Sequence, residues 1–216
     1  MTTDVFEPLT LRRPRTARTP ARSWRKRTFD CLLACSALLL FLPLFVLVAL
    51  AIRLEDGGPV FFLQPRTGLH GRLFTILKFR TMRACDDGPT VRQACRNDAR
   101  VTRVGRLLRK LSIDELPQLI NVLRGDMSIV GPRPHALAHD AAWRQLAPGY
   151  EDRFAVRPGL TGLAQVRGFR GEIADDDGLR GRIDADREYI ETWSFTRDLW
   201  LIMRTAPLIV ADPRAY

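Results

Sequence analysis

The longest apolar stretch of the chain lies near its N-terminus. Residues 31–52 carry no charged side chain, and a helix of that length reaches about 33 Å, enough to cross the roughly 30 Å hydrocarbon core of a bilayer. Pro43 stands in the middle of the stretch, where a proline removes a helical hydrogen bond and bends the helix. The pattern predicts a membrane helix over residues 23–53 that is broken near Pro43.

Basic residues flank this stretch on both sides. They precede it as Arg12, Arg13, Arg15, Arg18, Arg22, Arg25, Lys26 and Arg27, and they follow it as Arg53, Arg66 and Arg72. The positive-inside rule places the N-terminus in the cytoplasm, so a helix that crosses straight would export everything after Arg53. A helix that dips in and returns would keep both ends in the cytoplasm. The pattern leaves both arrangements open, because membrane helices tolerate proline.

Shorter elements follow the apolar stretch. Residues 59–64 and 72–79 have the composition of two strands, joined by a glycine-containing turn over residues 66–71. Residues 101–111 predict a basic amphipathic helix. Such a helix suits a membrane interface, although the same pattern is more common in a helix that packs on a core and solvates its basic face.

Another helix is predicted directly after the basic one. Ser112 and Glu115 have the spacing of a capping box, in which each side chain satisfies a backbone N–H near the helix start. The helix is therefore expected to begin within residues 112–114 and to run to Leu123. Gly125 follows as a stop signal, because glycine readily adopts the left-handed conformation that ends helices.

The two ends of the chain complete the predicted organisation. Residues 184–210 predict a last helix, interrupted near Pro207. Residues 1–22 are rich in Arg, Thr and Pro and predict a disordered basic tail that can contact anionic lipid headgroups. The tail and the membrane helix (23–53) precede one further domain, residues 54–216. The fold class is α/β (α+β) and mostly helical, with a small β-hairpin sheet and amphipathic helices at the membrane interface.

The charge of the chain limits its partners. Its 216 residues carry 34 Lys and Arg against 24 Asp and Glu, a formal net charge of +10, which favours nucleic acid, anionic lipid or a phosphorylated substrate. Aromatic and basic residues are little interleaved, which argues against single-stranded nucleic acid. The four cysteines form no CxxC pair, so a metal–thiolate site is not expected. His135 and His139 have helical spacing without a third ligand, and we assign them structural roles.

Two adjacent carboxylates, Asp114 and Glu115, lie where the helix after the basic segment is expected to begin. The helix dipole keeps a carboxylate ionised at such a position, and an ionised Asp can attack phosphorus and form a covalent intermediate. Glu115 would then assist proton transfer or help to bind a divalent ion. In isolation, such a pair is also typical of an ordinary first helical turn.

Cations on stiff supports surround this pair in the sequence. Lys78 and Arg80 alternate on one face at the end of a predicted strand, where two cations can grip a diphosphate. Arg133 stands between two prolines, and Arg157 precedes a proline and glycines that let backbone approach a ligand. Asp186 is a candidate metal or cation partner. Each feature alone has an ordinary alternative, such as a charge pair at a sheet edge or an exposed Arg in a turn.

The order of these features resembles one protein family. Five motifs occur in succession: KFRTM (78–82), DELPQL (114–119), NVLRGDMSIVGPRP (121–134), RPGLTGLAQV (157–166) and DREYI (186–190). Over residues 24–210 they resemble the bacterial sugar transferases, the monotopic polyprenyl-phosphate phosphoglycosyl transferases. The resemblance implies transfer of a phosphosugar from a cytosolic nucleoside diphosphate sugar to a polyprenyl phosphate, with Mg²⁺ as cofactor. It also implies a covalent intermediate on the Asp of the pair, with the nucleoside monophosphate leaving first.

The resemblance assigns roles to individual residues. It implies Asp114 as the nucleophile and Glu115 as its partner for Mg²⁺ or proton handling, so both are candidate metal ligands. The other implied site residues are Lys78, Arg80, Arg133, Arg157, the D-x-x-Y acid Asp186 and, as a weaker match, Arg106. The family's apolar helix is re-entrant and broken near a proline, here Pro43. This implies a protein of the bacterial inner (cytoplasmic) membrane whose catalytic domain, residues 54–216, faces the cytoplasm.

Two stretches narrow the subgroup. PRPHALAH (132–139) and GFRGE (168–172) resemble enzymes that load glucose 1-phosphate from UDP-glucose onto undecaprenyl phosphate, the first membrane step of exopolysaccharide or other glycoconjugate synthesis. The short chain is also common among galactose-loading relatives, and Arg167 replaces the usual Asn, so UDP-galactose and other UDP-sugars stay open. A non-catalytic basic protein that binds membrane lipids is the remaining alternative. A homodimer stays open, and nucleic acid is not an expected partner.

Overall fold

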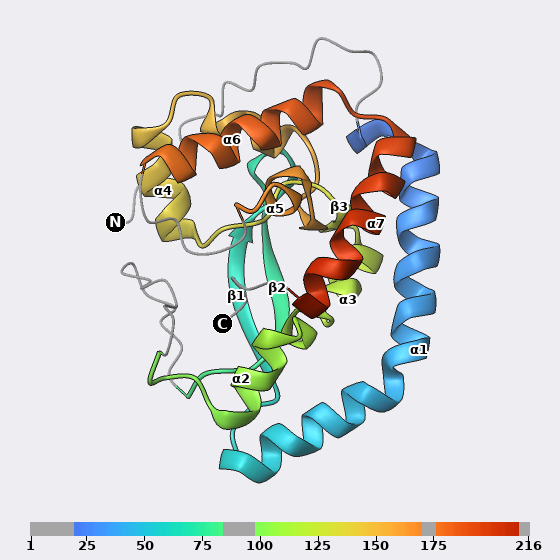
Figure 1. Cartoon of the computed structure of the whole chain (residues 1–216), viewed down its shortest axis with the longest axis vertical. Coiled ribbons are helices and arrows are strands. Elements are labelled where there is room, and N and C mark those ends of the chain that lie inside the picture. The colour runs from blue at the N-terminus through green and yellow to red at the C-terminus, as the bar shows by residue number, and fades with distance from the viewer. Residues whose placement is uncertain (1–19, 84–97, 170–175, 212–216) are drawn as a thin grey trace, which may run out of the picture.

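The computed structural model describes residues 20–83, 98–169 and 176–211, and within these ranges the fold is mostly helical, as predicted (Figure 1). The helices are α1 (Trp24–Asp56), α2 (Arg103–Lys110), α3 (Gln118–Arg124), α4 (Leu137–Leu146), α5 (Leu163–Val166), α6 (Asp176–Glu191) and α7 (Phe195–Ala211). The strands are β1 (Phe61–Thr67), β2 (Leu73–Phe79), β3 (Ser128–Val130) and β4 (Gly159–Thr161). The 3-10 turns are η1 (Pro20–Arg22), η2 (Leu69–Gly71), η3 (Ile113–Glu115) and η4 (Tyr150–Ala155). Most of the predicted basic tail and part of the GFRGE motif lie outside the described residues.

Helix α1 contains the predicted apolar segment. The Ser23 hydroxyl caps its N-terminus by accepting a 3.3 Å hydrogen bond from the Lys26 N–H, and Gly57 ends it with a left-handed φ of 69°. The helix bends about midway and continues to Asp56 (Figure 1), with Pro43 inside it. The expected break is therefore a bend in a continuous helix, because a proline removes one hydrogen bond while the flanking turns keep theirs.

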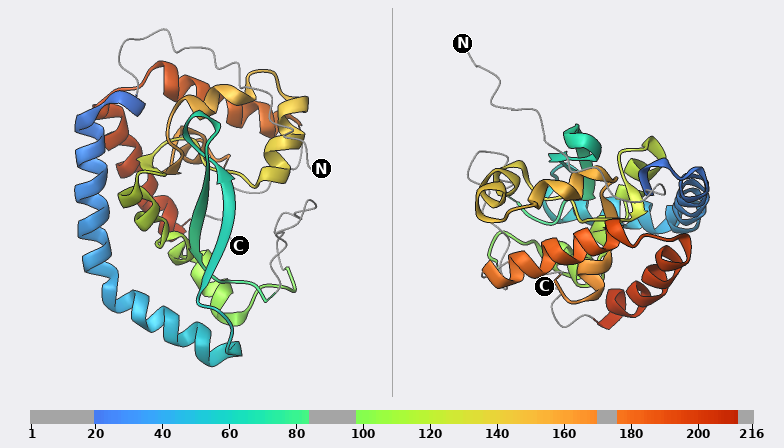
Figure 2. Two further views of the ribbon diagram at one scale, coloured as in Figure 1. Left: turned by 180° about the vertical axis from the view of Figure 1, so that it is seen from behind. Right: turned by 90° about the horizontal axis from the view of Figure 1, so that it is seen from above.

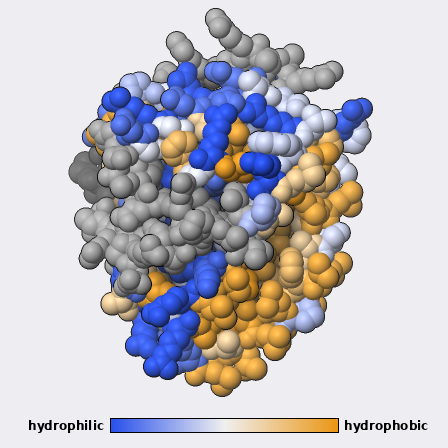
Figure 3. Space-filling view, viewed as in Figure 1, coloured by the Kyte–Doolittle hydropathy of each residue, from blue (hydrophilic) through white to orange (hydrophobic). Residues whose placement is uncertain are grey.

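Most apolar side chains of α1 face outward. Leu39, Leu40, Val46, Leu47 and Leu54 are each more than half exposed. In the space-filling view, apolar surface spreads over the lower right part of the molecule, whereas hydrophilic side chains gather at the top and at the lower left (Figure 3). Helix α1 is also long and apolar enough to cross a membrane. Because soluble proteins rarely expose so large an apolar patch, this surface suits contact with lipid.

Both ends of α1 are bound to the rest of the fold. At the N-terminal end, the Lys26 ammonium lies 2.7 Å from the Asp198 carboxylate of α7. Arg27 donates to two carbonyls at the C-terminal end of α3, at 2.5 and 2.9 Å. At the other end of the helix, Asp56 forms an ion pair with Arg80, which directly follows β2. The bent helix thus begins and ends on the same body of protein.

Strands β1 and β2 form the predicted hairpin, with bounds that differ by a few residues. They pair antiparallel from Phe61↔Phe79 to Thr67↔Leu73. The hairpin runs from the C-terminal end of α1 toward α4 and α6 (Figure 2). One of its faces carries Gln64 and Ile76, which are buried, and turns toward the core.

Asn121 of α3 fastens the hairpin to the core. Its side chain is fully buried; its Oδ1 accepts from the Leu77 N–H at 3.0 Å and its Nδ2 donates to the Thr75 carbonyl at 2.7 Å. The outer edge of a two-stranded sheet has backbone N–H and C=O groups with no neighbouring strand. Where that edge packs against the rest of the protein, these groups need side-chain partners, because an unpaired buried polar group is costly.

Replacing Asn121 with Ala should therefore destabilise the fold. Two backbone groups of β2 lose their partners at once and the buried Asn121 side chain is removed, so we expect a loss of about 2–4 kcal/mol in the free energy of unfolding. Chemical unfolding in detergent, followed by circular dichroism, measures it. As a matched control, Lys110→Ala on the exposed face of α2 should change stability by less than about 0.5 kcal/mol. Equal effects of the two substitutions would contradict the role of Asn121.

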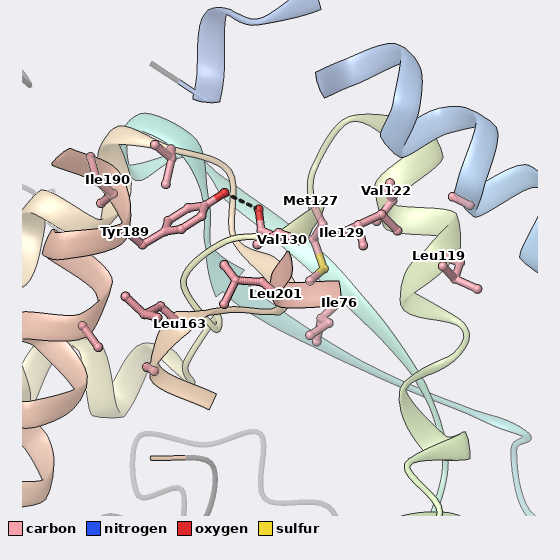
Figure 4. Packing of buried hydrophobic residues seen from close by; sticks show 14 residues of the cluster. Ile76, Leu119, Val122, Met127, Ile129, Val130, Leu163, Tyr189, Ile190 and Leu201 are labelled. Atoms are coloured by element: carbon pink, nitrogen blue, oxygen red, sulfur yellow. Dashed lines mark hydrogen bonds between the residues drawn. The ribbon is translucent and has the colours of Figure 1, made fainter. Parts of the chain in front are cut away.

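The main core brings the C-terminal half of the chain against α3 and β2. Figure 4 shows its buried side chains converging from β2, α3, β3, α5, α6 and α7. Tyr189 of α6 is buried among them and donates a 3.1 Å hydrogen bond to the Val130 carbonyl. Strands β3 and β4 pair in parallel through Ser128↔Gly159 and Val130↔Thr161. This packing fixes the start of the loop that follows β3.

The capping-box prediction is wrong. Ser112 has a left-handed φ of 55° and its side chain makes no capping hydrogen bond. The chain instead forms the single turn η3 and starts α3 only after Pro117, whose φ of −60° suits a helix start. Proline supplies no N–H to an earlier carbonyl, so a continuous helix from residue 112 is replaced by a turn and a new helix. Gly125 ends α3 with a φ of 92°, as predicted.

The single helix predicted over residues 184–210 is also wrong in detail. The chain forms α6 and α7, and the interruption falls at residues 192–194. The Ser194 hydroxyl accepts from the Arg197 N–H at 3.2 Å and so starts α7. Pro207 lies inside α7.

Candidate active site

Turn η3 places the carboxylate pair between the hairpin and the loop after β3. The left-handed Ser112 reverses the chain at the end of α2, and Asp114 and Glu115 then follow in one tight turn packed against β2. Asp114 is buried, with 9% of its surface exposed. The two neighbouring carboxylates are therefore held by backbone geometry on the inward side of the hairpin.

Glu115 is bound by two cations from distant segments. The Lys78 Nζ of β2 lies 2.8 Å from its Oε1, and Arg133 donates to both carboxylate oxygens, with Nη1 at 3.0 Å from Oε2. Although burial favours the neutral acid, Arg133 and Lys78 hold the pKa of Glu115 well below its usual range. The structure thus brings together Lys78, Arg133 and the pair, as the sequence indicated.

Asp114 has a different environment. Its carboxylate accepts no hydrogen bond and forms no close ion pair with any residue in the described ranges. Burial raises its pKa, and the positive charges of Lys78, Arg109 and Arg133 partly offset that rise. Environments of this kind, which push the pKa values of two neighbouring acids apart, are typical of catalytic pairs.

Four other residues assigned from the sequence lie apart from the pair. Arg80 forms an ion pair with Asp56 and donates to the Pro59 carbonyl at 2.7 Å. Arg157 donates to backbone carbonyls of Gly125 and Ala21, at 2.9 and 3.3 Å. Asp186 is buried in an ion pair with Arg153, at 3.0 Å. Arg106 is exposed on α2. In this structure the first three bind other parts of the chain.

A buried polar network that the sequence did not reveal supports the Arg133 loop. Arg153 of η4 donates to the Arg133 carbonyl at 2.5 Å and to the Tyr150 hydroxyl at 2.7 Å. Tyr150 in turn donates to Asp140 at 2.6 Å, and Asp140 also accepts from Thr67 at the end of β1, at 2.6 Å. These side chains come from β1, α4 and η4, and Thr67 lies far from the others in the chain, so no local motif reveals the network.

His135 is part of the same network. Its Nδ1 faces Arg153 and lies 2.9 Å from the Tyr150 hydroxyl, and its Nε2 lies 3.2 Å from Arg182. Burial and these arginines hold the pKa of His135 well below its usual range. The ring is therefore neutral and packed among donors, which fits the structural role assigned to it.

The two carboxylates differ as metal ligands. Both Glu115 oxygens already accept hydrogen bonds from cations, which leaves Glu115 less available than Asp114 as a metal ligand. The Asp114 oxygens remain available. Magnesium at phosphate sites is commonly held by one or two carboxylates, with substrate phosphates completing the shell, and Asp114 fits such a site. Within the described ranges, no group of three or more His, Cys, Asp or Glu residues could hold a metal by itself.

The chain is similar to one family model and to several known proteins. The family model described as "Bacterial sugar transferase" matches residues 21–212. The chain is 57% identical over 192 residues to a UDP-glucose:undecaprenyl-phosphate glucose-1-phosphate transferase of Caulobacter vibrioides, covering 89% of this chain and 72% of that one. It is 48% identical over 180 residues to the Escherichia coli protein of the same name, covering 83% of this chain but 39% of the relative. It is 40% identical over 212 residues to the exopolysaccharide production protein ExoY of Rhizobium meliloti, covering 91% and 90%.

Proposed function

Because the chain belongs to the bacterial sugar transferase family, we propose that it transfers a hexose 1-phosphate from a UDP-sugar to undecaprenyl phosphate, with glucose 1-phosphate as the first candidate. The names of two relatives, both UDP-glucose:undecaprenyl-phosphate glucose-1-phosphate transferases, support this donor and acceptor. The asymmetry of the carboxylate pair carries the proposal, since two cations bind Glu115 while no described residue hydrogen-bonds to the Asp114 carboxylate. An ionised, unengaged carboxylate beside cations is what attack on a phosphate requires.

The proposed reaction has two displacements at one phosphorus. In the first, an Asp114 oxygen attacks the phosphorus that bears the sugar, and the bond to the bridging oxygen breaks so that UMP leaves with the electron pair. In the second, an oxygen of undecaprenyl phosphate attacks the same phosphorus and releases the Asp114 carboxylate. The product is an undecaprenyl diphosphate sugar, which would start an exopolysaccharide or another glycoconjugate.

The neighbouring side chains stabilise charge in both steps. Lys78 and Arg133 lie beside the nucleophile and would hold the phosphoryl oxygens, while Glu115 orients both cations. Glu115 acts here as a positioning residue, because its low pKa makes it a poor carrier of protons. Mg²⁺, when bound at Asp114 with the donor phosphates, would neutralise diphosphate charge.

The path of α1 supports a re-entrant arrangement at the cytoplasmic membrane. Lys26 near its start and Asp56 at its end both form ion pairs with the same water-facing body of protein. A helix that crossed the bilayer straight would have its two ends on opposite sides. Both ends could not then contact the same body of protein. A helix that dips into one leaflet at its bend, with the catalytic domain in the cytoplasm, satisfies both contacts and the basic flanks.

The low-pH side of the profile of kcat/KM against pH, its acid limb, should follow the ionisation of Asp114. Burial raises its pKa to about 6, with Lys78 opposing that rise. Only the ionised carboxylate can attack, so kcat/KM should be level above about pH 7 and fall about tenfold for each pH unit well below pH 6. Initial rates of UMP release between about pH 4.5 and 8.5 measure this. A level profile down to about pH 5 would contradict the assignment.

The proposed function is tested by UMP release from a panel of UDP-sugars in nanodiscs with undecaprenyl phosphate and Mg²⁺. Release from UDP-glucose, with a smaller stoichiometric burst when the acceptor is left out, is expected from a covalent intermediate. Release from UDP-galactose or another UDP-sugar instead would keep the reaction and change the donor. UMP formation only when both substrates are present would argue against the covalent step. No release from any donor by a folded, membrane-bound protein would favour a non-catalytic membrane protein.

A further inference from the structure

Arg66 is a cation of the site region that has no carboxylate partner among the described residues. Its guanidinium donates to the Gln64 side chain, and its Nε is shielded from solvent without a hydrogen bond to any described residue. It forms no ion pair within the described ranges. A partly buried guanidinium usually has such a partner, because shielding an unpaired charge from water is costly. In the sequence, Arg66 stands only among the basic residues that follow the apolar stretch.

The position of Arg66 relates it to the pair. In the hairpin, Phe62 pairs with Lys78 and Phe74 pairs with Arg66. Positions four apart on a strand share a face, so Lys78 and Arg66 project from the same side of the hairpin. A β-bridge between Arg66 and Ala136 also places the end of β1 against the loop that carries Arg133.

The surroundings of Arg66 are positively charged. Burial and the nearby Arg133 lower the pKa of Arg66 to about 10, and the charges of Asp140 and Glu115 only partly offset this. Glu115 already binds Lys78 and Arg133. Asp140 accepts hydrogen bonds from two hydroxyl groups. Arg66 therefore has no acid of its own among the described residues, and an anionic ligand would supply that partner.

We propose that Arg66 binds the donor diphosphate, at the phosphate that leaves with the nucleoside. This inference rests on the proposed function. Negative charge grows on that phosphate as the bridging bond breaks, so a fixed guanidinium stabilises the transition state more than the bound substrate. Arg66 is thus a phosphate-binding residue that complements Lys78 and Arg133.

The geometry points to the donor rather than the lipid acceptor. Arg66 lies four residues beyond the partner of Lys78 along β1, roughly 13 Å farther from the strand end that adjoins α1. That strand end lies by the apolar part of the molecule, whereas the hairpin tip lies toward α4 and α6 at the hydrophilic end (Figures 1 and 3). A lipid-borne phosphate approaches from the apolar side, and the nucleotide comes from water.

Binding and stability together test the inference without relying on turnover. Thermal unfolding is measured for the wild type, Arg66→Met and Arg66→Lys, each with and without UDP and Mg²⁺. Without UDP, Arg66→Met should melt at the wild-type temperature or higher, because it removes an uncompensated charge. UDP should raise the melting temperature of the wild type. It should raise the melting temperature of Arg66→Lys by a smaller amount and leave that of Arg66→Met unchanged. Arg72→Met, an exposed arginine at the same hairpin tip, is the matched control and should behave as wild type.

Kinetics then identify the phosphate. The kcat/KM for the UDP-sugar should fall roughly 10- to 100-fold in Arg66→Met, as expected for a lost charged hydrogen bond, and the KM for undecaprenyl phosphate should stay within about twofold. A change confined to the acceptor would overturn the inference in favour of the lipid phosphate. A strongly lowered melting temperature with an unchanged UDP shift would show a structural role and also overturn it. If no UDP-sugar is turned over, the UDP shift still decides whether Arg66 binds a diphosphate.

Discussion

Replacing Asp114 with Asn should lower UMP release by roughly 10³-fold or more in a protein that stays folded. The amide has nearly the same shape as the carboxylate, but it is neutral and a poor nucleophile toward phosphorus. Lys78, Arg133 and Glu115 keep their mutual contacts, because none of them is hydrogen-bonded to Asp114. The first displacement should therefore fail while the binding of UDP is retained.

The stability of Asp114→Asn shows whether its activity is lost because the nucleophile is missing or because the protein no longer folds. Because the pKa of Asp114 is raised in the folded state, its charged form destabilises the protein at pH values above its unfolded pKa. Asn removes that charge, so the free energy of unfolding at pH 7 should stay the same or rise. UMP release and thermal unfolding are measured on the same samples. Asp184→Asn, at an exposed position of α6, is the control and should change neither quantity. Retention of more than about a tenth of the activity in Asp114→Asn would exclude Asp114 as the nucleophile.

Arg133→Met should be the next most damaging change, lowering kcat/KM by roughly 10²- to 10³-fold. Arg133 binds both oxygens of Glu115 and adds positive charge beside Asp114. Its loss leaves Glu115 with Lys78 alone and removes one of the charges that favour the ionised form of Asp114. The acid limb of the pH profile should consequently move to higher pH.

A lysine at position 133 tests the geometry of this contact. Arg133→Lys keeps the charge but loses the planar fork that binds two oxygens, so its kcat/KM should lie between those of the wild type and Arg133→Met. Its acid limb should shift less than that of Arg133→Met. Arg124→Met, an exposed arginine at the end of α3, should leave both the rate and the limb unchanged. An acid limb that stays in place in Arg133→Met would show that this arginine does not tune Asp114.

Which cations meet the carboxylate pair was only partly predictable from the sequence. The motif order indicated Lys78 and Arg133, and the structure brings both to Glu115. Arg80 and Arg157 stand in equally stiff segments, yet they bind backbone carbonyls elsewhere. A guanidinium suits a main-chain carbonyl as well as a phosphate, so rigidity alone does not tell these two uses apart. Arg66 was missed because its place beside Arg133 depends on the hairpin register.

Local signals misled where tertiary packing outweighed them. Ser112 and Glu115 have capping-box spacing, but Glu115 is bound by Lys78 and Arg133 and is not available to cap a helix. The apolar pattern placed α1 correctly because twenty or more uncharged residues have few alternatives. Ser194 is a residue type that commonly caps helix N-termini, so the start of α7 could have been predicted from it. The apolar periodicity on both sides of Ser194 favoured one continuous helix instead.

The contact between Lys26 and Asp198 also constrains the order in which the molecule can be completed. The two residues are 172 positions apart, and the Lys26 ammonium is almost fully shielded in the finished fold. At about 5–20 residues per second, a ribosome needs roughly 10–30 seconds to make the intervening chain. During that interval the apolar helix has emerged while its docking partner does not yet exist. Entry of α1 into the bilayer can therefore precede its attachment to α7, so that the lipid holds the nascent chain until the last helix closes the fold.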